Sequence, residues 1–355
     1  MQMRLGIQYL EELQVDNARD AGFTNFEVRY EDCTKEKLDN ITGIVLKLDD
    51  LSEEIFYDAL EKAKNSNAEY LMLDTVGVSD VKSLQDIVVK SAKQIEESDI
   101  SIYIENGYKY QKNGDCCYSL FSEARELNRM VAEFNKLCGK ECFGVCLNVG
   151  YANLIEKNVK VMVSELGDCI KVLHASDNDG KTDQHQMPCT FTTGRGIAST
   201  NWYDIIGPLV MRRKLEWIIF DTTGFVKRVP EKLQKTMLKF LWNMGQEWAE
   251  QFRMDEVLNQ PEKKIILFGA GKMAQNYMES WGEKYPPAFF VDNSSKAWGQ
   301  KAFGFEIKPP NAILEIPEQE RSVWICNQYY DAVGRQLRDM GVEYRCFWDQ
   351  YYLNL

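Results

Sequence analysis

The sequence predicts an α/β protein in which a (β/α)8 TIM barrel is followed by a smaller α/β domain. Short apolar runs alternate with amphipathic helical stretches over roughly the first 250 residues, the length that such a barrel needs. Polar residues end several of these runs. A further apolar run leads into a glycine-rich turn, which indicates a new domain. We therefore place the barrel at residues 1–255 and the second domain at residues 262–355.

Eight short apolar runs are predicted to be the barrel strands. In chain order they are Arg4–Gln8, Asn25–Arg29, Gly43–Leu48, Tyr70–Asp74, Ser101–Glu105, Phe143–Asn148, Ile170–His174 and Trp217–Asp221. The segments between them favour helices, because apolar residues recur there at helical spacing. The clearest of these segments are Glu53–Asn65, Val81–Glu97, Ser122–Leu137 and Lys232–Phe252. Eight strand–helix units fit a closed barrel, and an open doubly wound sheet is the alternative.

Four consecutive strands end in polar residues that suit a metal ion. These residues are Glu105, Asn148, His174 and Asp221. Because the carboxyl ends of parallel barrel strands meet at one rim, we expect the four side chains to converge. Two carboxylates, an amide and an imidazole suit a divalent cation such as Mn²⁺, Mg²⁺, Co²⁺ or Zn²⁺. The alternative is that polar residues stand wherever a strand leaves the core.

Histidine is rare in this chain and is confined to one segment. The two histidines among 355 residues are His174 and His185, in a stretch rich in aspartate, asparagine and glycine. Imidazole binds divalent metals and transfers protons near neutral pH, so the clustering favours a chemical role. Chance clustering of two structural histidines is the alternative.

Composition indicates a globular protein of the cytoplasm. Apolar residues make up 45% and charged residues 27% of the chain. The net charge of −12 argues against nucleic acid or an anionic membrane as a partner, because phosphates attract a basic face. The start, Met1–Gly6, lacks the apolar core of a signal peptide, and no apolar run reaches the roughly 20 residues of a membrane span. The ten cysteines form no Cys-x-x-Cys pair, so we expect buried free thiols, and a homo-oligomer is compatible with these patterns.

The second domain is predicted to begin with a buried strand at Ile265–Phe268. Gly269 and Gly271 follow in a Gly-x-Gly-x-x-Ala turn, and Asp292 ends the next strand about twenty residues later. Such a turn lets the backbone approach a phosphate, and the acid suits a ribose hydroxyl. Because the domain has half the size of a full dinucleotide fold, we expect a mononucleotide, a sugar nucleotide or no ligand rather than NAD.

Several segments of the barrel carry a resemblance to a known family. They are Tyr103–Asn106, Gly144–Ala152, His174–Gly180, Asp183–His185 and Gly194–Gly196. The sequence resembles the xylose isomerase-like TIM-barrel superfamily, which includes sugar phosphate isomerases and epimerases. The resemblance implies a small sugar or sugar phosphate as substrate, and one divalent metal held at the ends of strands five to eight.

The same resemblance implies roles for individual residues. Glu105 and Asp221 would bind the metal and exchange a proton with the carbon beside the substrate carbonyl, Glu105 as base and Asp221 as opposing acid. His185, Arg195 and Asp177 would orient substrate oxygens or a phosphate. The alternative for Arg195 is a solvated charge between two glycines.

Two departures from the family pattern concern the metal. The family's Asp-Thr-Gly-His is Asn148-Val-Gly-Tyr151 in this chain, and its final glutamate is the shorter Asp221. A neutral amide attracts a cation less strongly than a carboxylate, so the site is expected to bind metal weakly or to have lost it. The leading hypothesis is a metal-assisted sugar isomerase or epimerase. A non-catalytic sugar-binding or regulatory barrel is the alternative, and an endonuclease comes third because the chain is acidic.

A second resemblance concerns the carboxyl-terminal domain. Its segments Phe268–Lys272, Phe290–Asn293 and Gly304–Ile307 resemble the Rossmann-like domains at the N-termini of bacterial sugar O-acyltransferases. The resemblance implies a bound nucleotide or sugar nucleotide. We also expect the apolar strand Val323–Cys326 to lie beside the first strand of this domain.

Overall fold

The chain forms two compact units. The computed structural model describes residues 3–9, 12–33, 40–78, 81–191, 200–212 and 214–348. The first unit consists of Met1–Ile205 and Arg212–Ala249, and the second of Ile206–Met211 and Glu250–Leu355. Arg195, a predicted substrate contact, lies outside the described residues.

The first unit contains a closed barrel of eight parallel strands. Around the barrel the strands follow the order β1-β10-β9-β8-β5-β4-β3-β2. Their bounds are β1 (Arg4–Gln8), β2 (Phe26–Arg29), β3 (Ile41–Lys47), β4 (Tyr70–Asp74), β5 (Ser101–Glu105), β8 (Phe143–Asn148), β9 (Ile170–Ala175) and β10 (Trp217–Phe220). Pairing of β1 with β10 closes the ring. The predicted barrel is therefore confirmed, and the open sheet is excluded.

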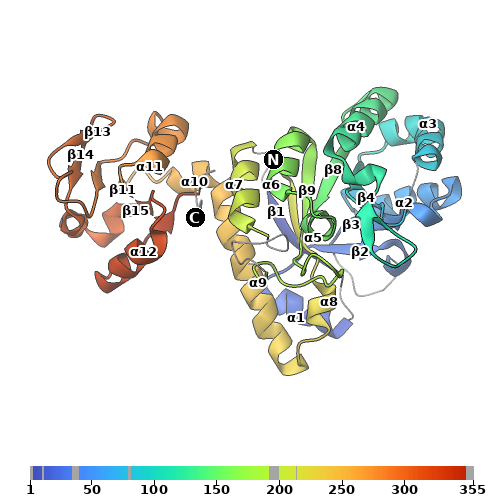
Figure 1. Ribbon diagram of the computed structural model, residues 1–355, viewed down its shortest axis with the longest axis horizontal. Helices are drawn as coiled ribbons and strands as arrows, with labels where there is room; N and C mark the ends of the chain where they lie inside the picture. The colour runs from blue at the N-terminus through green and yellow to red at the C-terminus, as the bar shows by residue number, and fades with distance from the viewer. Residues whose placement is uncertain are drawn as a thin grey trace. The chain divides into compact units, whose positions relative to one another are not determined.

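Helices surround the barrel and follow seven of its strands in the described part of the chain (Figure 1). They are α1 (Glu12–Ala21), α2 (Glu53–Ser66), α3 (Lys82–Glu97), α4 (Ala124–Cys138), α5 (Val149–Leu154), α6 (Val159–Leu166), α7 (Trp202–Arg212), α8 (Thr223–Val226) and α9 (Glu231–Phe252). Between β2 and β3 the described residues hold a single 3-10 turn, Tyr30–Asp32, in place of the predicted helix. After β5, the chain forms a small hairpin of β6 (Tyr108–Tyr110) and β7 (Cys116–Tyr118).

Local capping explains where several of these helices begin and end. The Ser52 side chain accepts a hydrogen bond from the Ile55 backbone at the start of α2. Asn67 ends α2 in the left-handed region, with a φ of 55°. Gly139 ends α4 with a φ of 66°.

Strand alternation determines which residues face the inside of the barrel. A buried apolar cluster draws its members from five strands: Tyr70, Met72, Tyr103, Cys146, Val172, Trp217 and Ile219. Because strand side chains alternate with a period of two, the next inward residue lies two positions further along. That residue is Glu105 after Tyr103, Asn148 after Cys146, His174 after Val172 and Asp221 after Ile219. These four polar residues therefore form the layer next to the apolar core, at the carboxyl ends of the strands.

The second unit is built around a six-stranded sheet in the order β13-β14-β12-β11-β15-β16. The strands are β11 (Lys264–Phe268), β12 (Phe289–Val291), β13 (Lys301–Ala302), β14 (Phe305–Lys308), β15 (Arg321–Ile325) and β16 (Arg345–Cys346). The helices are α10 (Met254–Leu258), α11 (Lys272–Tyr277) and α12 (Tyr330–Asp339). All strand pairs are parallel except β13 with β14. The predicted pairing of the first strand with the Val323–Cys326 segment is confirmed by β11 and β15.

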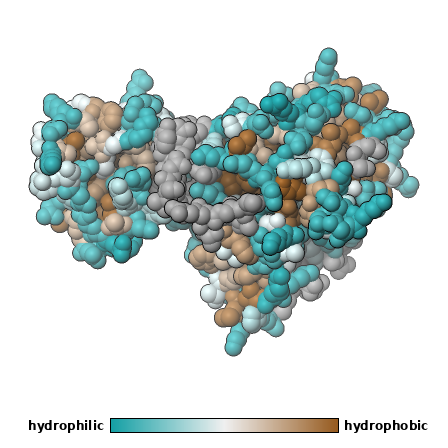
Figure 2. Space-filling view, in the orientation of Figure 1, coloured by the Kyte–Doolittle hydropathy of each residue, from teal (hydrophilic) through white to brown (hydrophobic). Residues whose placement is uncertain are grey.

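Hydrophilic and hydrophobic residues are mixed over the visible face of each unit, as on an ordinary protein surface (Figure 2). The exposed large apolar side chains of the described residues come from many different elements, among them Val89, Leu137, Phe240 and Leu314. Among the described residues, no helix is both long enough and apolar enough to cross a membrane.

Candidate functional site

The four predicted metal ligands meet inside the barrel at the carboxyl ends of four neighbouring strands. The Asn148 amide nitrogen donates to Glu105 Oε1 at 2.9 Å and to Asp221 Oδ2 at 3.3 Å. His174 Nδ1 lies 2.5 Å from Glu105 Oε1. All four side chains are buried, with residue exposures of 0 to 2%. The structure thus brings together residues that are up to 116 positions apart in the sequence.

The orientation of Asn148 differs from the one expected of a metal ligand. Its side-chain oxygen accepts from the Tyr151 backbone nitrogen at 3.1 Å and so caps α5. Its amino group therefore points toward the two carboxylates, and an amide nitrogen with its two protons offers no lone pair to a metal. Asn106 holds the strand end in place, because its side chain bonds both the backbone nitrogen and the carbonyl of Asn148, at 2.6 and 3.1 Å.

His174 lies between two carboxylates, one of which sequence reasoning missed. Its Nε2 lies 3.0 Å from Glu27 Oε1 on β2, opposite the contact of Nδ1 with Glu105. Glu27 also accepts from the Tyr70 hydroxyl at 2.8 Å and from Gln8 Nε2 at 3.2 Å. An available sequence signal was the Phe26-Glu27-Val28 pattern, in which two apolar residues face the helices and the acid between them faces the barrel interior.

Cys146 completes a compact cluster with Glu105 and His174. One potential ligand atom from each of the three residues lies within 4.8 Å of the others. Burial raises the pKa of the Cys146 thiol to about 12, although His174 opposes this effect. Cys146 is therefore a neutral thiol near pH 7, as expected of a buried free cysteine.

Asp221 is paired with the second histidine. His185 Nδ1 lies 2.8 Å from Asp221 Oδ1, and His185 Nε2 lies 3.2 Å from Asp183 Oδ2. His185 adopts a φ of 46°, a left-handed conformation that is uncommon outside glycine and is found at functional sites. Arg228 donates to the neighbouring Gln184 carbonyl at 2.8 Å and holds this loop over Asp221.

The two site carboxylates have opposite pKa shifts. Burial raises the pKa of Glu105 to about 7, although His174 opposes it. Burial also acts on Asp221, but the positive charge of His185 outweighs it and lowers the pKa of Asp221. Burial alone would lower the pKa of His185, yet Asp221 and Asp183 raise it to about 11. At neutral pH, Glu105 is thus able to take up or release a proton while Asp221 stays ionised.

The donor set fits a divalent cation. Among the described residues, no donor is aligned for a hydrogen bond with the buried Asp221 Oδ1, even though His185 is close to it. Glu105, His174 Nδ1 and Asp221 supply two carboxylates and one imidazole, which are ligands that such cations accept. In the part of the chain that the structure describes, Glu105, Cys146 and His174 have ligand atoms within 4.8 Å of one another, whereas Asp221 is linked to Glu105 through the Asn148 amide. Asp221 would therefore have to move closer to join Glu105 and His174 around a metal, and the Asn148 amino group would face that metal unless the side chain turned over.

Asp177 is fully buried near the site and serves the loop that follows β9. Its carboxylate accepts from the Phe191 backbone nitrogen at 3.0 Å and from the Asn178 backbone nitrogen at 3.1 Å. Its backbone also pairs with Gln186. These hydrogen bonds give Asp177 a structural role in holding the loop after β9. A substrate contact by Asp177 stays a prediction.

In the second unit, the predicted nucleotide residues surround the carboxyl ends of β11 and β12. Gly269 has a φ of 104°, and a Cβ there would lie 2.8 Å from the Cys326 carbonyl oxygen. This glycine is therefore required by packing alone. A Cβ at Gly271 would meet nothing within 4 Å. Asp292 Oδ1 accepts from the Ser294 backbone nitrogen at 2.8 Å.

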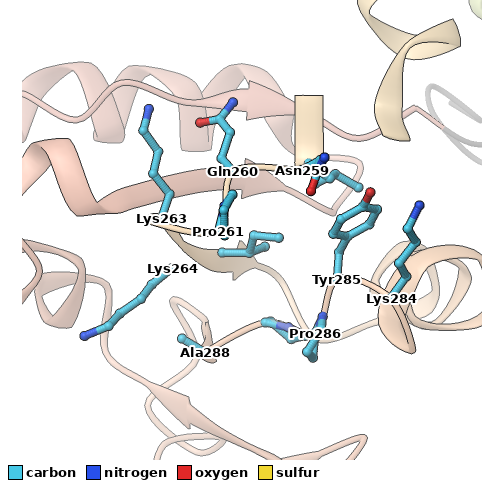
Figure 3. Close-up of a pocket in the computed structure, with 12 residues that line it drawn as sticks. Asn259, Gln260, Pro261, Lys263, Lys264, Lys284, Tyr285, Pro286 and Ala288 are labelled. Atoms are coloured by element: carbon cyan, nitrogen blue, oxygen red, sulfur yellow. The ribbon is translucent and has the colours of Figure 1, made fainter. Parts of the chain in front are cut away.

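A pocket of about 370 Å³ lies at the opposite end of the same sheet, around the start of β11 (Figure 3). It is lined by Leu258, Asn259, Gln260, Pro261, Lys263, Lys264, Ile265, Lys284, Tyr285, Pro286, Pro287 and Ala288. In this view the Lys263 and Lys284 side chains extend upward, and the Lys264 side chain extends to the lower left. Lys284 is paired with Asp255 at 2.7 Å. The lining does not include Gly269, Gly271 or Asp292, so the pocket is separate from the predicted nucleotide residues.

Comparisons with known proteins bear on the fold. No family model matches the sequence, and no curated protein matches it. A D-psicose 3-epimerase crystallised in the presence of D-fructose is similar at a TM-score of 0.50 and 12% identity, over 70% of this chain and 99% of that one. An L-ribulose 3-epimerase has a TM-score of 0.49 and 14% identity, over 74% and 99% of the two chains. The IOLI protein with a bound zinc atom has a TM-score of 0.48 and 13% identity, over 70% and 99%. The barrel of this chain thus has the fold of a D-psicose 3-epimerase.

Proposed function

We propose that the barrel is a metal-assisted isomerase or epimerase that moves a proton beside the carbonyl of a sugar or sugar phosphate. The observation that carries this proposal is the convergence of Glu105, His174 and Asp221 at the active rim of the barrel. The fold shared with an epimerase of a ketose supports the reaction class. A fold alone does not determine a reaction, so the residues of the site carry the argument.

The residues divide the proton transfer between two sides of the site. Glu105, with its pKa near 7, removes the proton from the carbon beside the carbonyl. Asp221 was predicted to be the opposing acid, but its pKa is lowered and it stays ionised beside His185. In this proposal His185, which holds a proton because its pKa is raised, replaces Asp221 as the acid that returns a proton from the other side. When bound, a divalent metal supplies polarisation of the substrate carbonyl, and Glu105, His174 and Asp221 would hold it. The buried setting excludes water from the proton that is transferred.

Exchange of substrate hydrogen for deuterium tests this proposal. Ketoses and their phosphates are incubated in D₂O with the wild type, Glu105→Gln and Glu216→Gln. Glu216 is the control, because it accepts from Tyr103 at 2.8 Å and contacts none of the site residues in the described part of the chain. We expect Glu105→Gln to lose about 10²–10⁴-fold in exchange rate while its melting temperature is retained, and Glu216→Gln to keep the rate. Full exchange by Glu105→Gln would refute the assignment of the base.

A second candidate is a sugar-binding barrel that uses no metal. The observation that favours it is that Asn148 and His174 already supply hydrogen bonds to Glu105 and Asp221. Elemental analysis of protein purified without chelator, followed by titration with Mn²⁺, Mg²⁺, Co²⁺ and Zn²⁺, separates the two candidates. Tight sugar binding without any metal would favour this second candidate.

For the second unit we propose a Rossmann-like domain, residues 262–355, that binds a nucleotide or sugar nucleotide. Strand β11 has β12 on one side and β15 on the other, so the strand order reverses at β11. Ligands of open α/β sheets bind where the order reverses, outside the carboxyl ends of the strands. The Gly269–Gly271 turn follows β11 at that point.

A further inference from the structure

Glu27 is a buried carboxylate with three donors and no place in the predicted site. It lies on β2 with its side chain inside the barrel and a residue exposure of 1%. The Tyr70 hydroxyl and Gln8 Nε2 donate to it at 2.8 and 3.2 Å, and His174 Nε2 lies 3.0 Å away. A buried carboxyl group needs hydrogen bonds that compensate for the lost water, and Glu27 has them.

The contact with His174 controls which ring nitrogen faces the site. Nε2 is directed at Glu27, and Nδ1 is directed at Glu105, 2.5 Å away. In metal-binding histidines, the hydrogen bond made by one ring nitrogen determines the tautomer and the ring orientation in which the other binds. The Tyr70 and Gln8 bonds in turn hold Glu27 in position.

We propose that Glu27 is the positioning residue of His174: it accepts the Nε2–H bond and so keeps Nδ1 directed at Glu105 and at a metal between them. Its consequence for catalysis rests on the proposed function. In this role Glu27 acts through the imidazole of His174 and not directly on a substrate or metal.

The barrel contains a matched pair that serves as a control. Tyr103 donates to Glu216 at 2.8 Å, as Tyr70 donates to Glu27, and the two tyrosine rings lie 5.1 Å apart. Glu216, however, makes no contact with either histidine among the described residues. Neutralising Glu216 therefore reproduces the loss of a tyrosine-bound carboxylate without affecting His174.

The first test is a long-range ¹H–¹⁵N NMR spectrum of the imidazoles in the metal-free, full-length protein. Only two histidines are present, so their signals separate, and His185→Gln assigns them. We expect a low-field Nε2 proton of His174 in the wild type and in Glu216→Gln. In Glu27→Gln this proton should move upfield, because a neutral acceptor forms a weaker bond than a carboxylate. An identical His174 spectrum in Glu27→Gln overturns the proposal.

The second test measures Zn²⁺ affinity by competition with a chelator. We expect Glu27→Gln to bind Zn²⁺ about 10–100-fold more weakly than the wild type, and Glu216→Gln to bind it equally well. Equal affinity in Glu27→Gln overturns the positioning role while the proposed function stands. If the wild type binds no metal, the metal-assisted function fails and the NMR spectrum alone decides the role of Glu27. Should Glu27→Gln not fold, Tyr70→Phe replaces it, and an unchanged Nε2 signal in that variant also overturns the proposal.

Discussion

At the scale of single residues, the site is a chain of alternating donors and acceptors. Glu27, His174, Glu105, Asn148 and Asp221 are linked in that order by contacts of 2.5 to 3.3 Å. The amide is the neutral link between two carboxylates, and it separates like charges that would otherwise repel each other at close range. Asn148 therefore stabilises the metal-free state and weakens the attraction for a cation.

Replacing this amide by a carboxylate should exchange stability for metal affinity. In Asn148→Asp, a third negative charge adjoins Glu105 and Asp221, so we expect a metal-free protein that is less stable by about 1–3 kcal/mol. The added charge should strengthen Zn²⁺ binding at least about tenfold, because an anionic ligand attracts a cation more strongly than an amide. Urea unfolding and chelator competition measure the two effects.

Asn153→Asp is the matched control for that substitution. Asn153 is also buried, but its side chain donates to the backbone and side chain of Asn178, at 3.2 and 2.9 Å, and not to a carboxylate. We expect this variant to lose stability without any gain in Zn²⁺ affinity. An equal gain in both variants would mean that general negative charge, and not the position of Asn148, determines metal binding.

The His185–Asp221 pair should make stability depend on pH. The folded-state pKa of His185 is raised from 6.5 to about 11, so the folded state holds one more proton than the unfolded state between these values. The stabilisation is complete below pH 6.5 and decreases as the pH rises toward 11. The difference in unfolding free energy between wild type and His185→Gln should therefore shrink from pH 6 to pH 10 in urea titrations. A constant difference over this range would contradict the raised pKa.

At the scale of elements, the alternation of apolar residues along the chain predicted most of the barrel strands. Predicted and observed bounds agree for β1, β4, β5 and β8, because apolar runs bounded by polar turns are a local signal. The segment between β2 and β3 lacks the predicted helix among the described residues, and only a 3-10 turn is seen. The alternation around Glu27 shows that its side chain faces the barrel interior, but its partner His174 lies 147 positions away and cannot be identified from the local sequence.

Close packing between β3 and β4 gives a prediction at this scale. A Cβ at Gly43 would overlap with the Tyr70 ring. Gly43→Ala should therefore displace that ring and destabilise the barrel by about 1–3 kcal/mol, the usual cost of overpacking. It should also disturb the Tyr70 bond to Glu27 and shift the Nε2 proton of His174. Urea unfolding and the imidazole NMR spectrum measure both effects, with Gly271→Ala as a control at a position that is open around its Cβ.

At the scale of the whole molecule, each compact unit carries its own candidate site at the carboxyl ends of parallel strands. In the barrel, Glu105 and Asp221 gather there. In the second unit, the Gly269–Gly271 turn lies there. Two units with separate cores need not unfold in one transition. The thermal unfolding of the barrel and that of the second unit are therefore treated as separate transitions.

Nucleotide binding by the second unit is tested on the full-length chain. Calorimetric titration with UDP-sugars, ATP and NAD should show binding of a sugar nucleotide or mononucleotide, and weaker or no binding of NAD. Gly271→Val should reduce this binding at least about tenfold, because the side chain occupies the path of the phosphate, while the melting temperature stays unchanged. Absence of binding by all three ligands, or equal binding by Gly271→Val, would rule out a site at this turn.

The barrel and the positions of its rim residues follow from local information. Period-two alternation and the polar residues at strand ends are properties of short segments, so they identify Glu105, Asn148, His174 and Asp221 without any knowledge of long-range contacts. The contacts among these residues depend on barrel closure instead. His174 meets Glu27 across 147 positions of sequence, and the α5 cap turns the Asn148 amino group toward the carboxylates. Register and capping act between segments, and only the folded chain brings those segments together.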